Sequence, residues 1–158
     1  MSSRELLRMS SDEVAAFLDA NHRAHVGTIN PDGTPHVVPL SYVILDGELT
    51  FWTDPRSRKV VNIKRDPRVT CLVEDGGHFS ELRAVQVSGY AELATDRDSS
   101  VRVGLALFQR ASGVIDDEVR ATVASMASER VAVVVHPERI VSWDHRKLPG
   151  VQAGEIGS

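Results

Sequence analysis

The sequence has one cysteine in 158 residues, so no disulfide bond forms within the chain. A chain of this kind suits a reducing compartment, and we expect the protein to be cytoplasmic. No apolar run approaches the roughly 20 residues that span a bilayer, and the polar N-terminus lacks the apolar core of a signal peptide. The cysteine, Cys71, lies within the apolar segment 69–73, which predicts a buried and unreactive thiol.

Several signatures of catalysis and nucleotide binding are also missing. The sequence contains no Gly-x-Gly-x-x-Gly, no Walker-type phosphate loop and no Gly-x-Ser-x-Gly elbow. The six histidines do not follow the spacing of zinc ligands, so we expect no metal site. The net charge of −4 argues against nucleic-acid binding by bulk charge.

What is present is a series of short apolar strands joined by turns. Asp46-Gly47 is a strong hairpin signal, and Asn30-Pro31-Asp32-Gly33 fits a type I turn. Strands are expected over 25–29, 35–45, 48–53, 69–74, 84–93, 130–136 and 139–143, and helices after Ser10 or Ser11, over 58–65, over 96–111 and from Asp116 or Asp117. Hairpin connections with helices between them predict a mainly β, antiparallel barrel with flanking helices.

The chain is short enough to form a single domain. We expect this domain to cover residues 10–146, after an N-terminal arm of residues 1–9. Residues 147–158 are expected to form a C-terminal tail that is mobile after Pro149. Pro39 interrupts the second strand, and because proline has no N–H to donate, it predicts a free edge or a bulge.

The most informative segment is a basic helix start. Ser57 is the expected N-cap, and Arg58 and Lys59 occupy the first turn, where acidic residues normally lie. Residues 54–68 contain six basic and two acidic residues, so their balance is +4 in a chain of −4. Cations at a helix N-terminus are unfavourable in the free protein and favourable beside a phosphate, although a solvated charged helix face is the simpler alternative.

Neighbouring residues suggest that the phosphate belongs to a planar cofactor. Trp52, at the end of the preceding strand, offers a ring for stacking, although aromatic residues in strands more often belong to the core. Thr53 and Asn62 offer neutral hydrogen bonds to a phosphate or to a ring edge. Asn62 follows Arg58 by four residues, so both lie on one face of the helix.

Three stretches of the chain carry a family resemblance. They are Val26-Gly-Thr-Ile-Asn-Pro-Asp-Gly-Thr-Pro-His-Val-Val-Pro-Leu40, Phe51-Trp-Thr53 and Ser57-Arg-Lys-Val-Val-Asn-Ile-Lys-Arg-Asp-Pro-Arg-Val69. The chain resembles the pyridoxamine 5'-phosphate oxidase-like superfamily of FMN-binding split β-barrels, and within it the coenzyme F-420-dependent (deazaflavin) reductases. The resemblance covers roughly residues 10–145 and is weaker over 96–128.

This resemblance implies a homodimer with two cofactor sites at the subunit interface. It implies that the phosphate is held by Arg58 and Lys59 with Arg56 and Asn62, and that Trp52 and Thr53 flank it. The ring is then expected along the strand. The residues implied there are His36, Val37, Val38 and Pro39. The partner segment around 78–82 or the strand containing Trp143 is expected to close the pocket.

The resemblance also implies the reaction, which is hydride transfer from reduced F-420 to a hydrophobic conjugated acceptor, such as a biliverdin-like tetrapyrrole or a quinone. Alternatives are an FMN-binding oxidoreductase, including one of the pyridoxamine-phosphate oxidase type, and a non-catalytic carrier of flavin, deazaflavin or haem. A long anionic F-420 tail suits a basic groove that Lys64, Arg65 and Arg68 extend. His36 and Tyr42 are conceivable proton donors, but no catalytic residue is assigned. Neither membrane nor nucleic acid is an expected partner.

Overall fold

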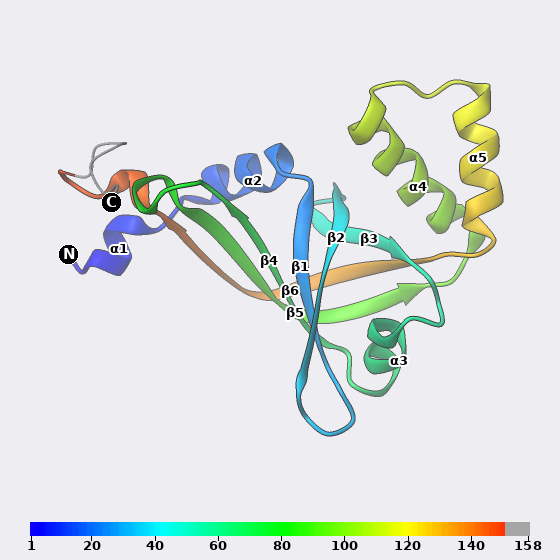
Figure 1. Cartoon of the computed structure of the whole chain (residues 1–158), viewed down its shortest axis with the longest axis horizontal. Coiled ribbons are helices and arrows are strands. Elements are labelled where there is room, and N and C mark those ends of the chain that lie inside the picture. The colour runs from blue at the N-terminus through cyan, green and yellow to red at the C-terminus, as the bar shows by residue number, and fades with distance from the viewer. Residues whose placement is uncertain (151–158) are drawn as a thin grey trace.

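The protein is described here by a computed structural model that covers residues 1–150. The expected mobile tail lies, from residue 151 onward, outside the described residues. Six antiparallel strands form a closed barrel in the order β1-β2-β3-β6-β5-β4 (Figure 1). The strands are β1 (Arg23–Ile29), β2 (Pro35–Leu45), β3 (Glu48–Thr53), β4 (Arg68–Asp75), β5 (Arg83–Ala94) and β6 (Val131–Asp144). The predicted antiparallel barrel with flanking helices is therefore confirmed.

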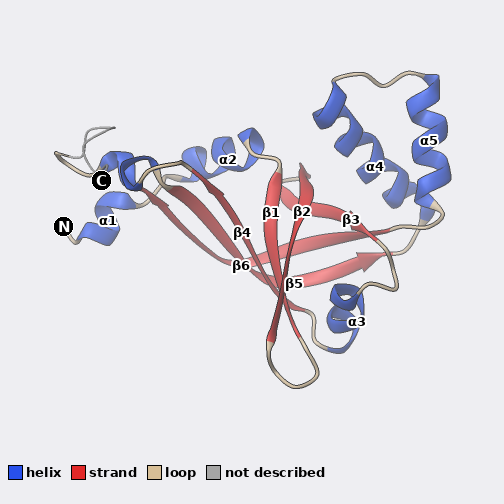
Figure 2. Ribbon diagram, in the orientation of Figure 1, coloured by secondary structure: helices blue, strands red, loops and turns tan. Residues whose placement is uncertain are grey.

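The helices lie around the barrel and mostly toward its two ends (Figure 2). They are α1 (Ser3–Leu7), α2 (Ser11–Ala20), α3 (Arg58–Arg65), α4 (Arg97–Ser112) and α5 (Asp117–Ala127), with short 3-10 turns at Phe79–Glu81 (η1) and His145–Lys147 (η2). The helix α1 was not expected, because its five residues carry no apolar periodicity. None of the helices in residues 1–150 has the length and apolar character that crossing a membrane requires.

The closing strand differs from its prediction. Two strands were expected, over 130–136 and 139–143, whereas β6 is continuous and pairs with almost the whole of β5. The register shifts between Ser88 and Gly89, and Pro137 is accommodated at this irregularity. A Cβ at Gly89 would overlap the His136 carbonyl oxygen, so this glycine permits the close approach that keeps the strand unbroken.

The barrel interior is filled by alternate residues of each strand. Val26, Phe51, Val85, Val133 and Val135 are fully buried, and α2 covers one end of this core with Phe17 and Leu18. The core residues Val85 and Val87 on β5, and Val133 and Val135 on β6, are two positions apart, as the period of a strand requires. Apolar burial of this kind is the main favourable contribution to folding.

A second, smaller core lies beneath α4. Trp52 packs there with Val103 and Ala132, and its indole N–H donates to the Ser100 hydroxyl at 2.7 Å. Gly104 makes the contact possible, because a Cβ at that position would lie 2.8 Å from the Trp52 ring. The pair α4 and α5 is thereby attached to the outside of β2 and β3 (Figure 1).

The strand β2 changes partner along its length, which leaves part of one edge free. Its N-terminal half pairs with β1, and only residues 42–45 pair with β3. The Tyr42 amide donates to the His22 carbonyl, so even-numbered residues of β2 direct their backbone N toward β1 and odd-numbered ones direct it away. Pro35 and Pro39 therefore place their nitrogens at the unpaired edge, and Pro39 marks an edge, not a bulge.

Candidate functional site

The start of α3 differs from that of the other α-helices in residues 1–150. In α1, α2, α4 and α5 the N-cap side chain accepts a backbone N–H, and an acidic residue lies in the first turn. Ser57, the N-cap of α3, has the expected extended backbone but makes no such bond, and the first turn holds no acid. The first N–H groups of α3 therefore remain available to an external acceptor.

Two cations of this first turn have no partner in the described chain. Arg58 is exposed and Lys59 is half-buried, and neither side chain makes a hydrogen bond or an ion pair within residues 1–150. Partial burial lowers the pKa of Lys59, and the nearby positive charge of Arg130 adds to this effect, against the opposing influence of Asp54. A desolvated ammonium group beside free amides favours the binding of an anion.

Arg56 lies beside these cations and is tied to Asp54. Its guanidinium contacts the Asp54 carboxylate at 3.2 Å, and the Arg56 side chain remains 89% exposed. The same carboxylate accepts the Arg56 backbone N–H at 2.7 Å, which holds the loop before α3 in a tight turn. Arg56 is therefore positioned at the rim of the helix start.

Arg130 is a further cation at this place, and the sequence reasoning missed it. The register pairs Thr53 with Val131, which sets Arg130 next to Asp54 across the two strands. Its side chain has no hydrogen-bond partner in residues 1–150. Arg130 is separated from α3 by more than 60 residues of sequence, and only the β3–β6 pairing reveals their proximity.

The end of β3 contributes hydroxyl groups, whereas its tryptophan is directed elsewhere. Thr53 is buried, and its Oγ1 lies 3.5 Å from the Ser57 Oγ at the mouth of α3. Trp52 belongs to the small core beneath α4, where its N–H is bonded to Ser100. The structure thus brings Thr53, but not the Trp52 ring, to the group of cations.

Asn62 lies inside the fold and not at its surface. It is 0% exposed, and its amide N–H₂ donates to Thr28 Oγ1 and to Asn30 Oδ1, each at 3.1 Å. These bonds attach α3 to the end of β1. Asn62 therefore positions the helix, while the surface of the first turn is formed by its neighbours.

The residues of β2 along which the cofactor ring is expected lie beside this attachment. His36 pairs with Thr28, the residue that receives the Asn62 bond, and Val38 pairs with buried Val26. Directly paired residues share a face of the sheet, so His36 and Val38 lie on the inward side, half-exposed, beside the free edge. Val37 is on the opposite face and 58% exposed.

The free edge of β2 presents few backbone donors. Because Pro35 and Pro39 have no N–H, the Val37 N–H is the single outward donor between them, and it is flanked by outward carbonyl groups. Such an edge can bond a planar ring that carries both acceptor and donor atoms. It also resists pairing with a strand of another chain.

The basic residues at the far end of α3 are engaged within the fold. Arg65 donates to the Asn62 side chain and to the Ile29 carbonyl. Arg68 is paired with Asp66 at 2.7 Å, and this pair holds the pKa of the Asp66 carboxyl at about 2. Of the three residues considered for an extended basic groove, only Lys64 has no such bond within residues 1–150.

Two residues with chemically interesting side chains lie away from this site. Cys71 is buried, and burial raises its pKa to about 12, in agreement with an unreactive thiol. Tyr42 is buried as well, its pKa is raised by burial, and its hydroxyl donates to the Leu18 carbonyl at 2.5 Å. Tyr42 is thus engaged in holding α2 on the barrel.

A groove of about 570 Å³ crosses the outer face of the sheet beside the β2 edge. Val37 lies at one side of it, Leu72 and Gln86 line its floor on β4 and β5, and Arg139 borders it on β6. The lining is mostly apolar, and the hydroxyl groups of Thr70 and Ser88 form a polar contact of 3.0 Å within it.

Comparisons with known proteins agree with this architecture. The pyridoxamine 5'-phosphate oxidase family matches residues 10–144, and a comparison with curated proteins found no match. Among solved structures, Rv2991, a conserved hypothetical protein of Mycobacterium tuberculosis, is 37% identical with a TM-score of 0.89 over 99% of both chains. A protein described as an F420 reductase is 28% identical, with a TM-score of 0.62 over 79% of this chain and 93% of that chain.

More distant structures share the fold alone. HutZ, described as the heme storage protein of Vibrio cholerae, is 15% identical, with a TM-score of 0.64 over 84% of this chain and 94% of that chain. The family match extends from α2 to the last residue of β6 and so includes the whole barrel and the start of α3. The chain therefore belongs to the pyridoxamine 5'-phosphate oxidase family of split β-barrels.

Proposed function

We propose that this protein is a coenzyme F-420-dependent oxidoreductase that reduces a hydrophobic conjugated molecule. The observation that carries the proposal is the uncapped start of α3, where free N–H groups meet the unpartnered cations Arg58 and Lys59. This arrangement is unfavourable until an anion binds there. The choice of deazaflavin is supported by the 28% identity to a protein described as an F420 reductase.

The phosphate of the cofactor fits the residues at this end of the barrel. Arg58 offers a bidentate guanidinium and Lys59 a partly desolvated ammonium group, while the hydroxyl groups of Thr53 and Ser57 add neutral bonds. Arg56 stands at the rim and adds positive charge. The buried Asn62 holds α3 in the orientation in which its first turn faces the ligand.

We propose that the ring lies along His36, Val37, Val38 and Pro39. Its polar edge would accept the Val37 N–H and donate to a neighbouring carbonyl of the free β2 edge. Val38 offers an apolar wall, and His36 is the titratable group nearest to the ring in this arrangement. Trp52 contributes by supporting the end of β3 from beneath α4 and not by stacking.

The cofactor would supply the hydride, since reduced deazaflavin is a two-electron donor. The protein's residues would hold the phosphate, align the ring with the free edge and exclude water from the ring face. The acceptor takes up the hydride and one proton and is thereby reduced by two electrons, and His36 is the residue we would test first as the source of that proton.

We further propose that two copies of the chain form a homodimer and complete the pocket. The mostly apolar groove beside Val37 and Leu72 is the surface that a second copy would cover, which would enclose the ring between the subunits. The expected consequence is that Leu72→Glu gives a monomer in sedimentation experiments and weakens cofactor binding at the same time. A monomer with unchanged affinity would contradict the shared site.

An FMN-dependent enzyme is the second candidate, and one observation favours it. The engagement of Arg65 and Arg68 within the fold removes much of the basic track along α3 that a long anionic tail would follow. FMN ends at the phosphate and needs only the first turn, where Arg58 and Lys59 lie. Both cofactors would use the same phosphate site, so binding experiments must include both.

The reaction is tested by mixing the protein with chemically reduced F-420 and a quinone or biliverdin under anaerobic conditions. We expect the acceptor to be reduced faster than in a protein-free reaction, as followed by the absorbance of the oxidised deazaflavin. Arg58→Ala/Lys59→Ala should lose most of this acceleration. If reduced FMN supports turnover and reduced F-420 does not, the second candidate replaces the first, and turnover with neither contradicts both.

A further inference from the structure

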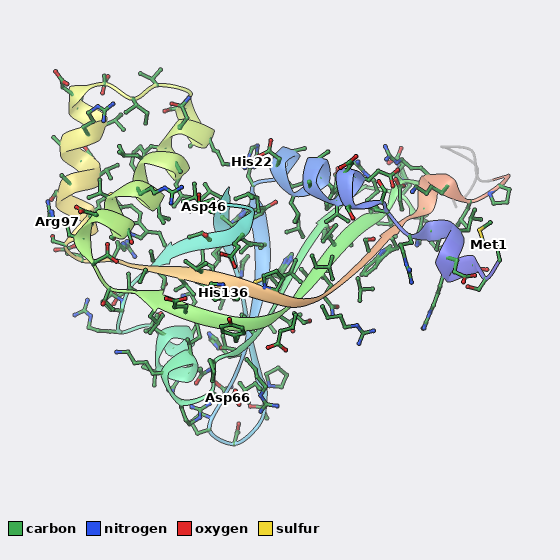
Figure 3. The ribbon with its side chains drawn as sticks, turned by 180° about the vertical axis from the view of Figure 1, so that it is seen from behind. Met1, His22, Asp46, Asp66, Arg97 and His136 are labelled. Atoms are coloured by element: carbon green, nitrogen blue, oxygen red, sulfur yellow. The ribbon has the colours of Figure 1, made fainter. Side chains whose placement is uncertain are left out.

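A second groove lies at the opposite end of the barrel from the α4–α5 pair. It has a volume of about 960 Å³ and is lined by residues of α1, the start of α2, β5, β6 and η2. Figure 1 shows α1 at the opposite end of the molecule from α4 and α5. Figure 3 shows this end from behind, with Met1 at the outer end of α1. We call it the arginine groove after Arg4, Arg8 and Arg139, which line it.

The charge of the arginine groove is one-sided. No acidic residue is among its lining residues, although acidic residues outnumber lysines and arginines 22 to 18 in the whole chain. The guanidinium groups of Arg4, Arg8 and Arg139 make no hydrogen bond or ion pair within residues 1–150. The neighbouring acid on α1, Glu5, is instead held by the capping bonds of Ser2. Three unpaired guanidinium groups around one groove favour a carboxylate or a similar anion.

The wall between the arginines is apolar. Ile140 is 49% exposed on β6, and Leu7 of α1 and the indole ring of Trp143 are half-exposed in the same groove. Hydrophobic walls with a few placed polar groups are the usual composition of a small-molecule site. The ligand that matches both features has an apolar body and a negatively charged head.

We propose that the arginine groove binds a small organic anion with an apolar body, such as a medium-chain carboxylate. The carboxylate would be held by two of the three arginines, and the chain or ring would lie on Ile140, Leu7 and Trp143. A second copy of the protein is a poorer occupant, because a two-fold contact centred on this groove would set the same cations against one another. This site does not include the first turn of α3 and does not depend on the cofactor assignment, and it shares Gln86 and Arg139 with the groove that the proposed second copy would cover.

The test uses the full chain and the fluorescent anion 8-anilinonaphthalene-1-sulfonate as the probe. We expect saturable binding to the wild type, and Arg4→Gln/Arg8→Gln, which changes the two arginines that line this groove alone, should weaken it at least about tenfold, because charge-assisted hydrogen bonds are the strong ones. The matched control is Arg23→Gln/Arg120→Gln, which removes two exposed, unbonded arginines elsewhere and should leave the affinity unchanged. Equal probe affinity in Arg4→Gln/Arg8→Gln and wild type, or no saturable binding, would overturn the proposal.

Competition separates this site from the others. Decanoate should displace the probe, acetate should not because it lacks the apolar body, and FMN at saturation should not because it binds elsewhere. Displacement by acetate as strong as by decanoate, or full displacement by FMN, would refute the assignment. Sedimentation of the same variants gives a further check. If Arg4→Gln/Arg8→Gln changes the oligomeric state, the groove is an interface between copies and the proposal fails.

Discussion

Replacing Arg58 and Lys59 by alanine should separate ligand binding from folding stability. Each residue is expected to make a charge-assisted hydrogen bond to the phosphate, and such bonds contribute roughly 1.5–3 kcal/mol each. Both side chains remain partly exposed, so the lower figure applies, and about 3 kcal/mol for the pair corresponds to a rise in Kd of about two orders of magnitude. The buried attachment of α3 through Asn62 is untouched.

The same change should not destabilise the free protein. Two cations in the first turn oppose the positive end of the helix dipole, and each such charge costs roughly 0.3–1 kcal/mol at low ionic strength. The free energy of unfolding of Arg58→Ala/Lys59→Ala is therefore expected to equal that of the wild type or to exceed it by up to about 2 kcal/mol. A large loss of stability would mean that these side chains hold the fold.

The assay is a fluorescence titration with FMN and with riboflavin, followed by urea unfolding of each variant. Riboflavin has the same ring without the phosphate, so its affinity should not change in Arg58→Ala/Lys59→Ala. The exposed pair Arg23→Ala/Arg120→Ala controls for the loss of two positive charges. An FMN affinity that falls no more than that of the control, or a riboflavin affinity that falls equally, would refute the phosphate site.

Three further changes test the scaffold. Gly104→Ala should destabilise the fold by about 1–3 kcal/mol in urea unfolding, because its Cβ would meet the Trp52 ring at 2.8 Å, and an unchanged midpoint would contradict that packing. Asn62→Ala should lower stability by about 1–3 kcal/mol, since Thr28 loses a buried partner, whereas a direct phosphate ligand would lower affinity alone. The pKa of His136 is raised chiefly by its bond to a glutamate, so its stabilising effect is full below the unfolded pKa and is lost as pH rises through the folded value. His136→Gln should flatten this dependence, and an unaltered pH profile of unfolding would disprove the assignment.

The contacts behind the His136 prediction join three strands. Its Nδ1 lies 2.5 Å from Glu48 and its Nε2 lies 2.6 Å from Glu92, so both ring nitrogens donate when the imidazole is protonated. The ring also lies 4.9 Å from that of Tyr90. His136 is labelled on β6 in Figure 3, and its side chain is 24% exposed, so water can reach the group and it can be titrated.

The fold could be predicted from the sequence where local signals agree with the tertiary arrangement. The Asp46-Gly47 hairpin and the helix over 58–65 are confirmed, because turn residues and helix boundaries depend mainly on neighbouring residues. The division of β6 into two strands was wrong, because Gly89 of the neighbouring strand accommodates Pro137 without a break in the pairing. The sequence around a proline does not show that a residue of another strand will accommodate it.

Some residues of the candidate site could be predicted from the sequence, and others could not. The cations of α3 are visible in sequence because they violate the normal preference of a helix start. Arg130 is not visible, since it joins them only through the β3–β6 register. The direction of a side chain also could not be predicted from the sequence. Trp52 and Asn62 have the residue types of a cofactor site, but they form hydrogen bonds with Ser100 and Thr28 inside the fold.

The measurement that tests the central claim most directly is a side-by-side titration of the cofactor-free protein with F-420 and FMN. The account predicts saturable binding of F-420, tighter than that of FMN, with Arg58→Ala/Lys59→Ala weakening both. Tighter binding of FMN would replace the deazaflavin assignment by a flavin one and retain the phosphate site. Binding of neither cofactor would contradict the claim that the start of α3 is a phosphate site.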